Sequence, residues 1–204
     1  EKTSISGQKL FSSVIFTLAL IICAQAQAND TSYPVFNPKL VLLSSIQNIN
    51  LRDIDSVSDG CWRNPSNTLD AVELSFRRNK FGVNRGKREA DGTTTFENSF
   101  LPTLEVGAVG YELSDTSCAV HITVELSSIV GINLPTPDGE ERKTGLTYIS
   151  LFQRSILMSG SKQDMQSRIS EAAVECAESA MLEILRAQEN LQKNYPDYWK
   201  FLGE

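Results

Sequence analysis

His121 is the only histidine in the chain, and its imidazole is the side chain best suited to act as a general base near neutral pH. Thr123 and Glu125 share one face of a predicted strand with it. A serine-type hydrolase needs a nucleophile, a base and a group that orients the base. The chain lacks a G-x-S-x-G elbow, and polar rows are normal on the solvent side of a half-covered sheet. A hydrolase centred on His121 is therefore the alternative, and a non-enzymatic role is favoured.

Three cysteines follow residue 28, and their positions predict one disulfide. Cys61 and Cys118 each lie in polar, turn-rich surroundings at the edge of a predicted element, so we expect them to pair. A cysteine peptidase would instead pair one of these thiols with His121, and a disulfide would remove both thiols. Cys176 lies on the apolar stripe of a predicted helix, so we expect it to be reduced and buried.

The sequence predicts neither a metal site nor a cofactor. No two cysteines are close in sequence and His121 is the sole histidine, so the ligand spacing of a zinc site is missing. Asp138, Glu140 and Glu141 cluster in a predicted loop but lack the spacing of a calcium loop. Phosphate-binding loops and dinucleotide glycine patterns are also missing.

A group of basic residues interrupts an otherwise acidic chain. Its members are Arg77, Arg78, Lys80, Arg85, Lys87 and Arg88. One interpretation is a solvated helix end followed by a loop. The other is a single patch that contacts anionic groups such as lipid phosphates, glycan carboxylates or an acidic protein. On the second interpretation these six residues are candidate binding residues.

The C-terminal segment 194–204 is rich in aromatic residues, with Tyr195, Tyr198, Trp199 and Phe201 close together. Such a tail either packs back on its own sheet or forms an exposed anchor for a partner. We name Tyr198 and Trp199 as candidate binding residues for the second case.

Residues 1–28 have the pattern of a secretory signal peptide. Lys2 and Lys9 precede an uncharged apolar run, Leu10–Cys23, and alanines in A-x-A spacing follow it. We expect a mature chain that begins near Gln27 or Asn29 and works in the periplasm or outside the cell. An uncleaved membrane anchor is the alternative, although the run is shorter than the about 20 residues that span a bilayer.

Composition limits the classes of function. The chain has 19 basic and 25 acidic residues, a net charge of −6. Removal of Glu1, Lys2 and Lys9 leaves 17 basic and 24 acidic residues, and 17 − 24 gives −7. An acidic chain is not expected to bind nucleic acid, which requires a basic surface. After the signal no apolar run is long enough to cross a bilayer, and the oligomeric state stays open.

The first half of the expected domain combines a strand with a helix. We expect an extended leader over residues 29–39, because Pro34 and Pro38 oppose a helix. A strand over Leu40–Ile54 and a turn follow. Asn64-Pro65 then predicts the start of a helix whose stop is Gly82. Residues 84–100 are polar and glycine-containing, which predicts a hairpin or loop.

The second half predicts three strands and a long helix. The strands span Leu101–Leu113, Ala119–Val130 and Thr147–Met158, and a turn over 131–145 joins the last two. The middle strand alternates with Val120, Ile122, Val124 and Leu126 inward, which indicates an antiparallel sheet covered on one face. Apolar residues at helical spacing predict an amphipathic helix over Lys162–Leu191.

These elements predict an α+β fold, a two-layer sandwich in which a short helix and a long C-terminal helix pack on a mainly antiparallel sheet of 4–5 strands. The expected division is a signal peptide at 1–28, a leader at 29–39, one α+β domain at 40–193 and a tail at 194–204. We expect an exported, non-enzymatic binding or assembly module that contacts a protein or an anionic envelope component. Besides the hydrolase, a carrier of an apolar ligand between sheet and long helix is a second alternative.

Overall fold

The computed structural model describes residues 37–58, 60–135 and 142–203. The expected signal peptide and residues 29–36 of the expected leader lie outside these described residues. Asn37–Glu204 form one compact unit. Its elements, in chain order, are α2 (Pro38–Ser44), β1 (Asn48–Val57), α3 (Pro65–Arg78), β2 (Gly82–Arg85), β3 (Lys87–Arg88), β4 (Thr94–Thr95), β5 (Thr103–Ser114), β6 (Ser117–Pro135), β7 (Arg142–Ser161), α4 (Lys162–Asn194) and α5 (Pro196–Gly203).

The main sheet has five strands in the order β2-β1-β5-β6-β7 and is mixed. β1 runs parallel to both β2 and β5, whereas β5, β6 and β7 are antiparallel neighbours. The fold class α+β is confirmed, but the prediction of a mainly antiparallel sheet is wrong in this detail. The reason is the connection through α3, which returns the chain to the same end of the sheet and makes β1 and β2 parallel.

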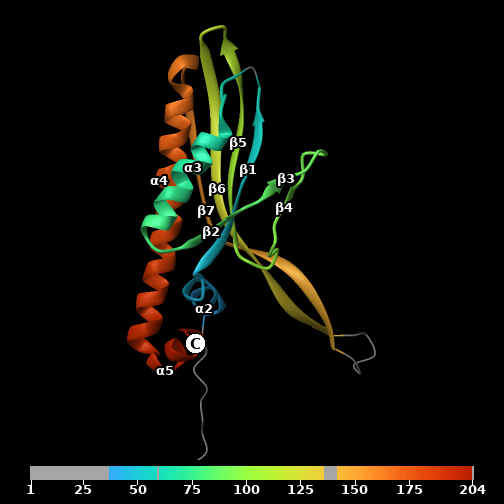
Figure 1. Ribbon diagram of the computed structural model, residues 1–204, viewed down its shortest axis with the longest axis vertical. Coiled ribbons are helices and arrows are strands. Elements are labelled where there is room, and N and C mark those ends of the chain that lie inside the picture. The colour runs from blue at the N-terminus through green and yellow to red at the C-terminus, as the bar shows by residue number, and fades with distance from the viewer. Residues whose placement is uncertain (1–36, 59, 136–141, 204) are drawn as a thin grey trace, which may run out of the picture. The chain divides into compact units, whose positions relative to one another are not determined.

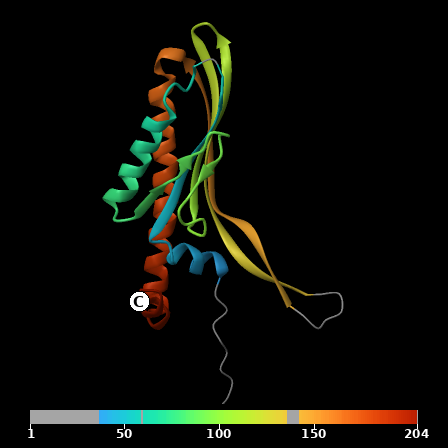
Figure 2. The same cartoon turned by 45° about the vertical axis from the view of Figure 1, so that its right-hand side comes forward.

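The two larger helices, α3 and α4, lie on the same face of this sheet, as Figures 1 and 2 show. The predicted alternation along β6 is confirmed, because Val120, Ile122, Val124 and Leu126 are all fully buried whereas His121 is exposed. The predicted stripe of α4 is confirmed as well. Its buried members include Met165, Ile169, Ala173, Cys176, Ala180 and Ile184. The core therefore lies between one face of the sheet and the two helices.

Helix α3 begins where the sequence predicts. The side chain of Asn64 accepts a hydrogen bond from the backbone N–H of Asn67, and Pro65 occupies the first helical turn. The C-terminal end of α3 differs from the prediction. The left-handed residue is Lys80, with φ 67°, and Gly82 is already the first residue of β2.

The predicted strand over Leu40–Ile54 is wrong in its first part. Residues Pro38–Ser44 form helix α2, which the Asn37 side chain caps by accepting a hydrogen bond from the N–H of Lys39 at 3.0 Å. A short apolar run can form either element, and periodicity does not distinguish them. Packing of α2 against α4 decides the outcome, and β1 starts only at Asn48.

The hairpin formed by β6 and β7 is longer than predicted. The paired region extends to Pro135 and Arg142, so much of the expected turn over 131–145 is strand. Residues 136–141 lie outside the described part. In Figures 1 and 2 the distal half of the hairpin diverges from the helices. The expected hairpin or loop over residues 84–100 contains the short antiparallel pair β3–β4.

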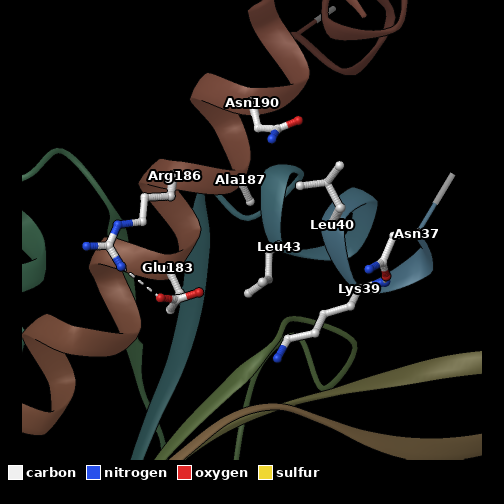
Figure 3. Close-up of a pocket in the computed structure, with 8 residues that line it drawn as sticks. All are labelled: Asn37, Lys39, Leu40, Leu43, Glu183, Arg186, Ala187 and Asn190. Carbon is white, nitrogen blue, oxygen red and sulfur yellow. Dashed lines mark hydrogen bonds and ion pairs between the residues drawn. The ribbon is translucent and has the colours of Figure 1, made fainter. Parts of the chain in front are cut away.

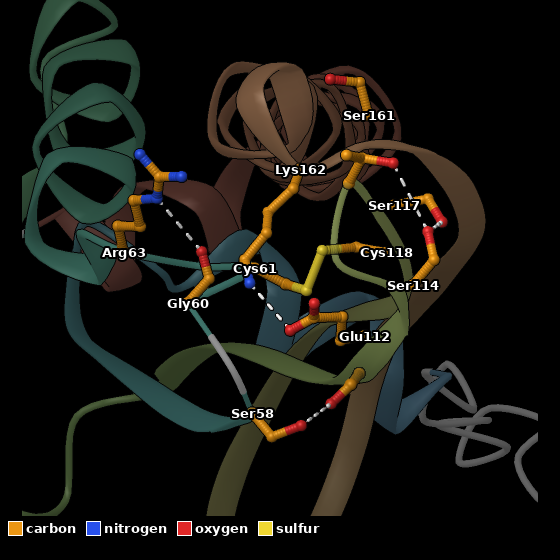
Figure 4. Close-up of a disulfide and its surroundings, with 12 residues drawn as sticks. Ser58, Gly60, Cys61, Arg63, Glu112, Ser114, Ser117, Cys118, Ser161 and Lys162 are labelled. Carbon is orange, nitrogen blue, oxygen red and sulfur yellow. Dashed lines mark hydrogen bonds and ion pairs between the residues drawn. A yellow bond between two sulfur atoms is a disulfide. The ribbon is translucent and has the colours of Figure 1, made fainter.

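The predicted disulfide between Cys61 and Cys118 is confirmed, with the two α-carbons 6.0 Å apart. It joins the segment before α3 to the start of β6, and both cysteines are buried. Figure 4 shows the bond beside an ion pair, in which Lys162 Nζ lies 2.8 Å from Glu112 Oε2. The start of α4 is thus tied to the same corner. Cys176 is unpaired and buried, as predicted, and burial raises the pKa of its thiol.

The aromatic tail is helical and forms α5, which packs against the end of α4. Tyr198 is 45% exposed and Trp199 is half-buried. The tail therefore contacts the long helix. Within the described residues, no helix combines the length and apolar character needed to span a bilayer.

Candidate functional site

The six predicted basic residues come from three consecutive elements. Arg77 and Arg78 end α3, Lys80 follows in the turn, Arg85 ends β2, and Lys87 and Arg88 form β3. The structure brings part of this group together and separates the rest. The positive charge that is available to a ligand depends on which carboxylates each cation contacts.

Two of these cations are held by acidic side chains of α3. Arg85 Nε donates to Glu73 Oε2 at 2.8 Å, and a second guanidinium nitrogen of Arg85 contacts Asp70. Arg77 Nε donates to Glu73 Oε1 at 2.6 Å, and Arg77 Nη2 donates to the carbonyl of Val83 at 2.9 Å. Glu73 thus bridges both arginines. This network attaches α3 to β2 and neutralises charge that the sequence alone leaves free.

The pKa of Glu73 reflects this position. Burial by itself would raise the pKa, but hydrogen bonds from Arg77 and Arg85 and their positive charges lower it further than burial raises it. The net pKa lies below the ordinary value of 4.5. Glu73 is therefore ionised near neutral pH and keeps both arginines engaged.

The other members are less constrained. Arg88 Nη1 lies 3.7 Å from Asp53 Oδ2, and its side chain is 63% exposed. Lys87 Nζ lies 3.5 Å from Glu89 Oε1. Within the described part of the chain, no ion pair involves Arg78 or Lys80. The most available cations are thus Lys87 and Arg88 on β3, and Arg78 and Lys80 near the end of α3.

A pocket of about 240 Å³ lies beside part of the basic group. Arg85 and Arg88 line it together with Arg52 of β1, which the sequence analysis did not select. Arg52 Nε donates to Glu105 Oε2 at 2.8 Å across the parallel pair β1–β5. The start of α3, at Pro65 and Ser66, forms another part of the lining. Two arginines and the start of α3 therefore line one cavity together with Asp53, whereas the Arg52 side chain shares the sheet face of Ile54 and pairs there with Glu105.

A second feature is the sheet face opposite the helices. We call it the open face and define it by Ile54 of β1, Val109 and Tyr111 of β5, His121 of β6 and Leu157 of β7. The four apolar side chains are 43%, 59%, 60% and 76% exposed, in that order. The register places Val109, His121 and Leu157 side by side on three neighbouring strands. The open face is thus an apolar surface with one imidazole near its middle.

The surroundings of His121 bear on the hydrolase alternative. Its cross-strand neighbours are Val109 and Leu157, and neither can serve as a nucleophile or orient the imidazole. In residues 37–58, 60–135 and 142–203, no hydrogen bond or ion pair joins His121 to another side chain. Thr123 and Glu125 lie farther along the same strand. The geometry therefore shows an exposed imidazole on an apolar face.

The space between the sheet and α4 bears on the carrier alternative. Large side chains from both layers meet there and are less than 2% exposed, among them Ile122, Leu126, Met165, Ile169 and Ile184. These side chains fill the layer in which an apolar ligand was expected.

A pocket outside that layer lies between α2 and α4, and Figure 3 shows its lining. Leu40, Leu43 and Ala187 supply its apolar part, and Glu183 and Arg186 form an ion pair at its rim. Its volume of about 240 Å³ lies below the roughly 300–1,000 Å³ of typical small-molecule sites. The pocket therefore gives the carrier hypothesis little support.

The sequence analysis missed the open face, although a signal was present. Val109 and Tyr111 alternate with the inward residues of the same predicted strand, at positions where a solvated face normally carries polar residues. Arg52 had no such signal, because only the pairing of β1 with β2 places it beside the pocket.

Among the described residues, no group of three or more histidine, cysteine or acidic side chains is arranged to hold a metal ion. No protein-family model matches the chain, and a search of curated proteins likewise finds no match.

Proposed function

We propose that the protein is an exported, non-enzymatic binding or assembly module that contacts a protein of the cell envelope through its open face. The observation that carries this proposal is the exposure of Ile54, Val109, Tyr111 and Leu157 on the side of the main sheet opposite α3 and α4. Contiguous apolar side chains are costly to leave in water and mark surfaces that bind other proteins. The buried disulfide suits export, because disulfides persist in oxidising compartments.

The rigidity of the surface supports the same role. The open-face residues lie on β1, β5, β6 and β7, four neighbouring strands of the main sheet. The Cys61–Cys118 bond and the packed helices fix these strands from the opposite face. A preformed surface loses little conformational entropy when a partner binds.

A charge placed on the open face should abolish partner binding. We expect Val109→Glu to remove most of the protein that cross-links to the wild-type chain in envelope extracts, because the carboxylate would be desolvated at the contact. Quantitative mass spectrometry of the cross-linked material measures this loss. Leu74→Glu is the matched control, since Leu74 is a similarly exposed apolar residue of α3, at 49%. Equal capture by both variants, at unchanged melting temperature, would contradict the proposal.

A second candidate function is the binding of anionic groups at the arginine-lined pocket. Guanidinium groups pair with carboxylates and phosphates, and the N-terminus of a helix also favours an anion. Arg85 and Arg88 line the cavity beside the start of α3. Asp53, Asp70 and Glu73 offset part of this charge, so Arg88 is the cation that a ligand would engage first.

Replacement of Lys87 and Arg88 by serine should weaken binding to anionic vesicles several-fold and leave the melting temperature nearly unchanged, because both side chains are mostly exposed. Cosedimentation at low and physiological ionic strength measures the effect, which should shrink as the Debye length falls to about 8 Å. Arg186→Ser is the control, because Arg186 is 70% exposed and has one acidic partner. Vesicle binding that is insensitive to the serine replacements would exclude this function.

A further inference from the structure

The two edge strands of the main sheet differ in length. At one edge, β2 is only 4 residues long. At the other edge, β7 is 20 residues long, and in residues 37–58, 60–135 and 142–203 no strand pairs with its outer side. A long free edge presents a row of N–H and C=O groups that is a template for another strand. Natural proteins usually protect such edges with charges, proline or covering segments.

The outer edge of β7 carries little of this protection. From Gly145 to Ser161 the sequence contains no proline, and Arg154 is its single charged residue. The guanidinium of Arg154 is directed to α4, where it donates to Glu175 and Ser179 at 2.7 Å each. The Arg154 side chain is therefore not placed to repel a strand that approaches the edge. A register shift opposite Leu126 and Ser127 is the one irregularity along the pair β6–β7.

The structure also shows which backbone groups point outward. Arg168 Nη1 donates to the carbonyl oxygen of Ser159 at 2.6 Å, so this carbonyl faces away from β6. Outward groups recur at every second residue of an antiparallel strand, which assigns the next ones to Leu157, Ser155 and Gln153. No backbone hydrogen bond joins these three residues to a described residue outside β6. Arg168 thus caps one end of the edge and leaves a free stretch centred on Ser155.

We propose that this stretch pairs antiparallel with the same stretch of a second copy of the chain, so that two sheets become one. A two-fold axis at Ser155 places Ser155 opposite its counterpart and places Gln153 opposite Leu157 of the other copy. Each pair then exchanges two backbone hydrogen bonds. The free stretch is self-complementary about its centre.

Charge favours a second copy at this edge. The chain carries a net charge of −6, so two copies repel each other over most of their surface. The stretch from Gly145 to Ser161 is nearly neutral. Arg154 lies within it and Arg168 contacts it, and both cations already contact oxygen atoms of their own copy. The edge is therefore a place where two acidic chains can approach closely.

The position of α4 permits the pairing. The helix packs on both β6 and β7, so its axis lies over the space between them. A two-fold axis perpendicular to the sheet keeps both copies of α4 on the same face, about 10 Å apart, which is two strand spacings of ~4.8 Å. Packed helices lie about 8–10 Å apart. The two helices therefore meet at packing distance without overlapping, and the open face becomes continuous across both copies.

Site-specific cross-linking tests this dimer. With the full chain, Ser155→Cys should form an intermolecular disulfide under mild oxidation, because residues of a hydrogen-bonded pair have α-carbons about 5.5 Å apart, within the range of a disulfide. Peptide mass spectrometry should identify the bond that joins the two position-155 peptides. Ser150→Cys is the control on the same strand, because its counterpart would lie many residues away. Equal cross-linking of both variants would overturn the proposed register.

Light scattering after size-exclusion chromatography supplies the second test. The wild type should have twice the 22.6 kDa mass of one chain. Ser155→Lys should raise the dimer dissociation constant about tenfold, because like charges would lie directly opposite each other, whereas Ser150→Lys should leave it unchanged. Ser155 is exposed, so circular dichroism should show an unchanged fold. A monomeric wild type at 100 µM would overturn the dimer, yet would leave the protein-binding role of the open face intact.

Discussion

Replacement of both Cys61 and Cys118 by alanine should lower the free energy of unfolding by about 4 kcal/mol. The bond closes a loop with a sequence separation of 57, and cross-linking a loop of that length restricts the unfolded chain by about this amount. A domain of this size typically loses about 2–4 °C of melting temperature per kcal/mol, so the midpoint should fall by roughly 8–16 °C. Denaturant titration and calorimetry measure both quantities.

The matched control is Cys176→Ala, which removes one buried sulfur without breaking a covalent bond. We expect it to cost only about 1 kcal/mol, the transfer and cavity terms for one small group. If the double variant lost no more stability than this control, the disulfide would be structurally unimportant. In the wild type, Ellman's reagent should react with Cys176 only after unfolding, because Cys176 is fully buried in the folded chain.

Phe76→Ala should cost about 3–5 kcal/mol of unfolding free energy. The ring of Phe76 is fully buried in the core, and it contacts Phe81 edge-on with ring centroids 5.6 Å apart. This contact holds the end of α3 against the segment that leads into β2. Its loss leaves a cavity that the mixed sheet and two helices cannot fill without moving. Guanidinium titration monitored by circular dichroism gives the stability change.

Leu74→Ala provides the comparison within the same helix, because Leu74 is 49% exposed and should cost less than about 1 kcal/mol. Phe76→Leu should fall between the two, since it keeps part of the buried volume. A Phe76→Ala loss as small as that of Leu74→Ala would mean that α3 is not fixed by this ring. The pairing of Glu73 with Arg85 would then be the principal link between α3 and β2.

The tertiary structure changes the interpretation of the two candidate surfaces in opposite directions. The basic group looks like a uniform patch in sequence, yet Glu73 and Asp70 engage Arg77 and Arg85. The charge available to an anion is thus smaller than the number of basic residues suggests. The open face changes in the opposite direction, because its apolar residues come from separate strands and form a surface only when β1, β5, β6 and β7 align. The protein-binding role is therefore the primary proposal.

Local patterns were sufficient for much of the fold. The cap Asn64-Pro65, the alternation along β6 and the apolar stripe of α4 each depend on residues close in sequence, and each is confirmed. The pairing of Cys61 with Cys118 also followed from the expected compartment and the surroundings of each cysteine. Such features are determined by backbone propensity and periodicity, which any short window contains.

Contacts between distant residues decided the remainder. The run Leu40–Leu43 became helix because it packs on α4, which follows it by more than a hundred residues. The sheet is mixed because the crossover through α3 sets the direction of β2, and strand direction leaves no trace in the periodicity of a strand. Arg52 reaches the pocket, and Leu157 reaches the open face, only through strand pairing. The sequence by itself therefore determined the elements other than α2 and their buried faces. The tertiary structure decided that α2 is a helix, the direction of β2 and which exposed side chains meet, because these depend on non-local packing.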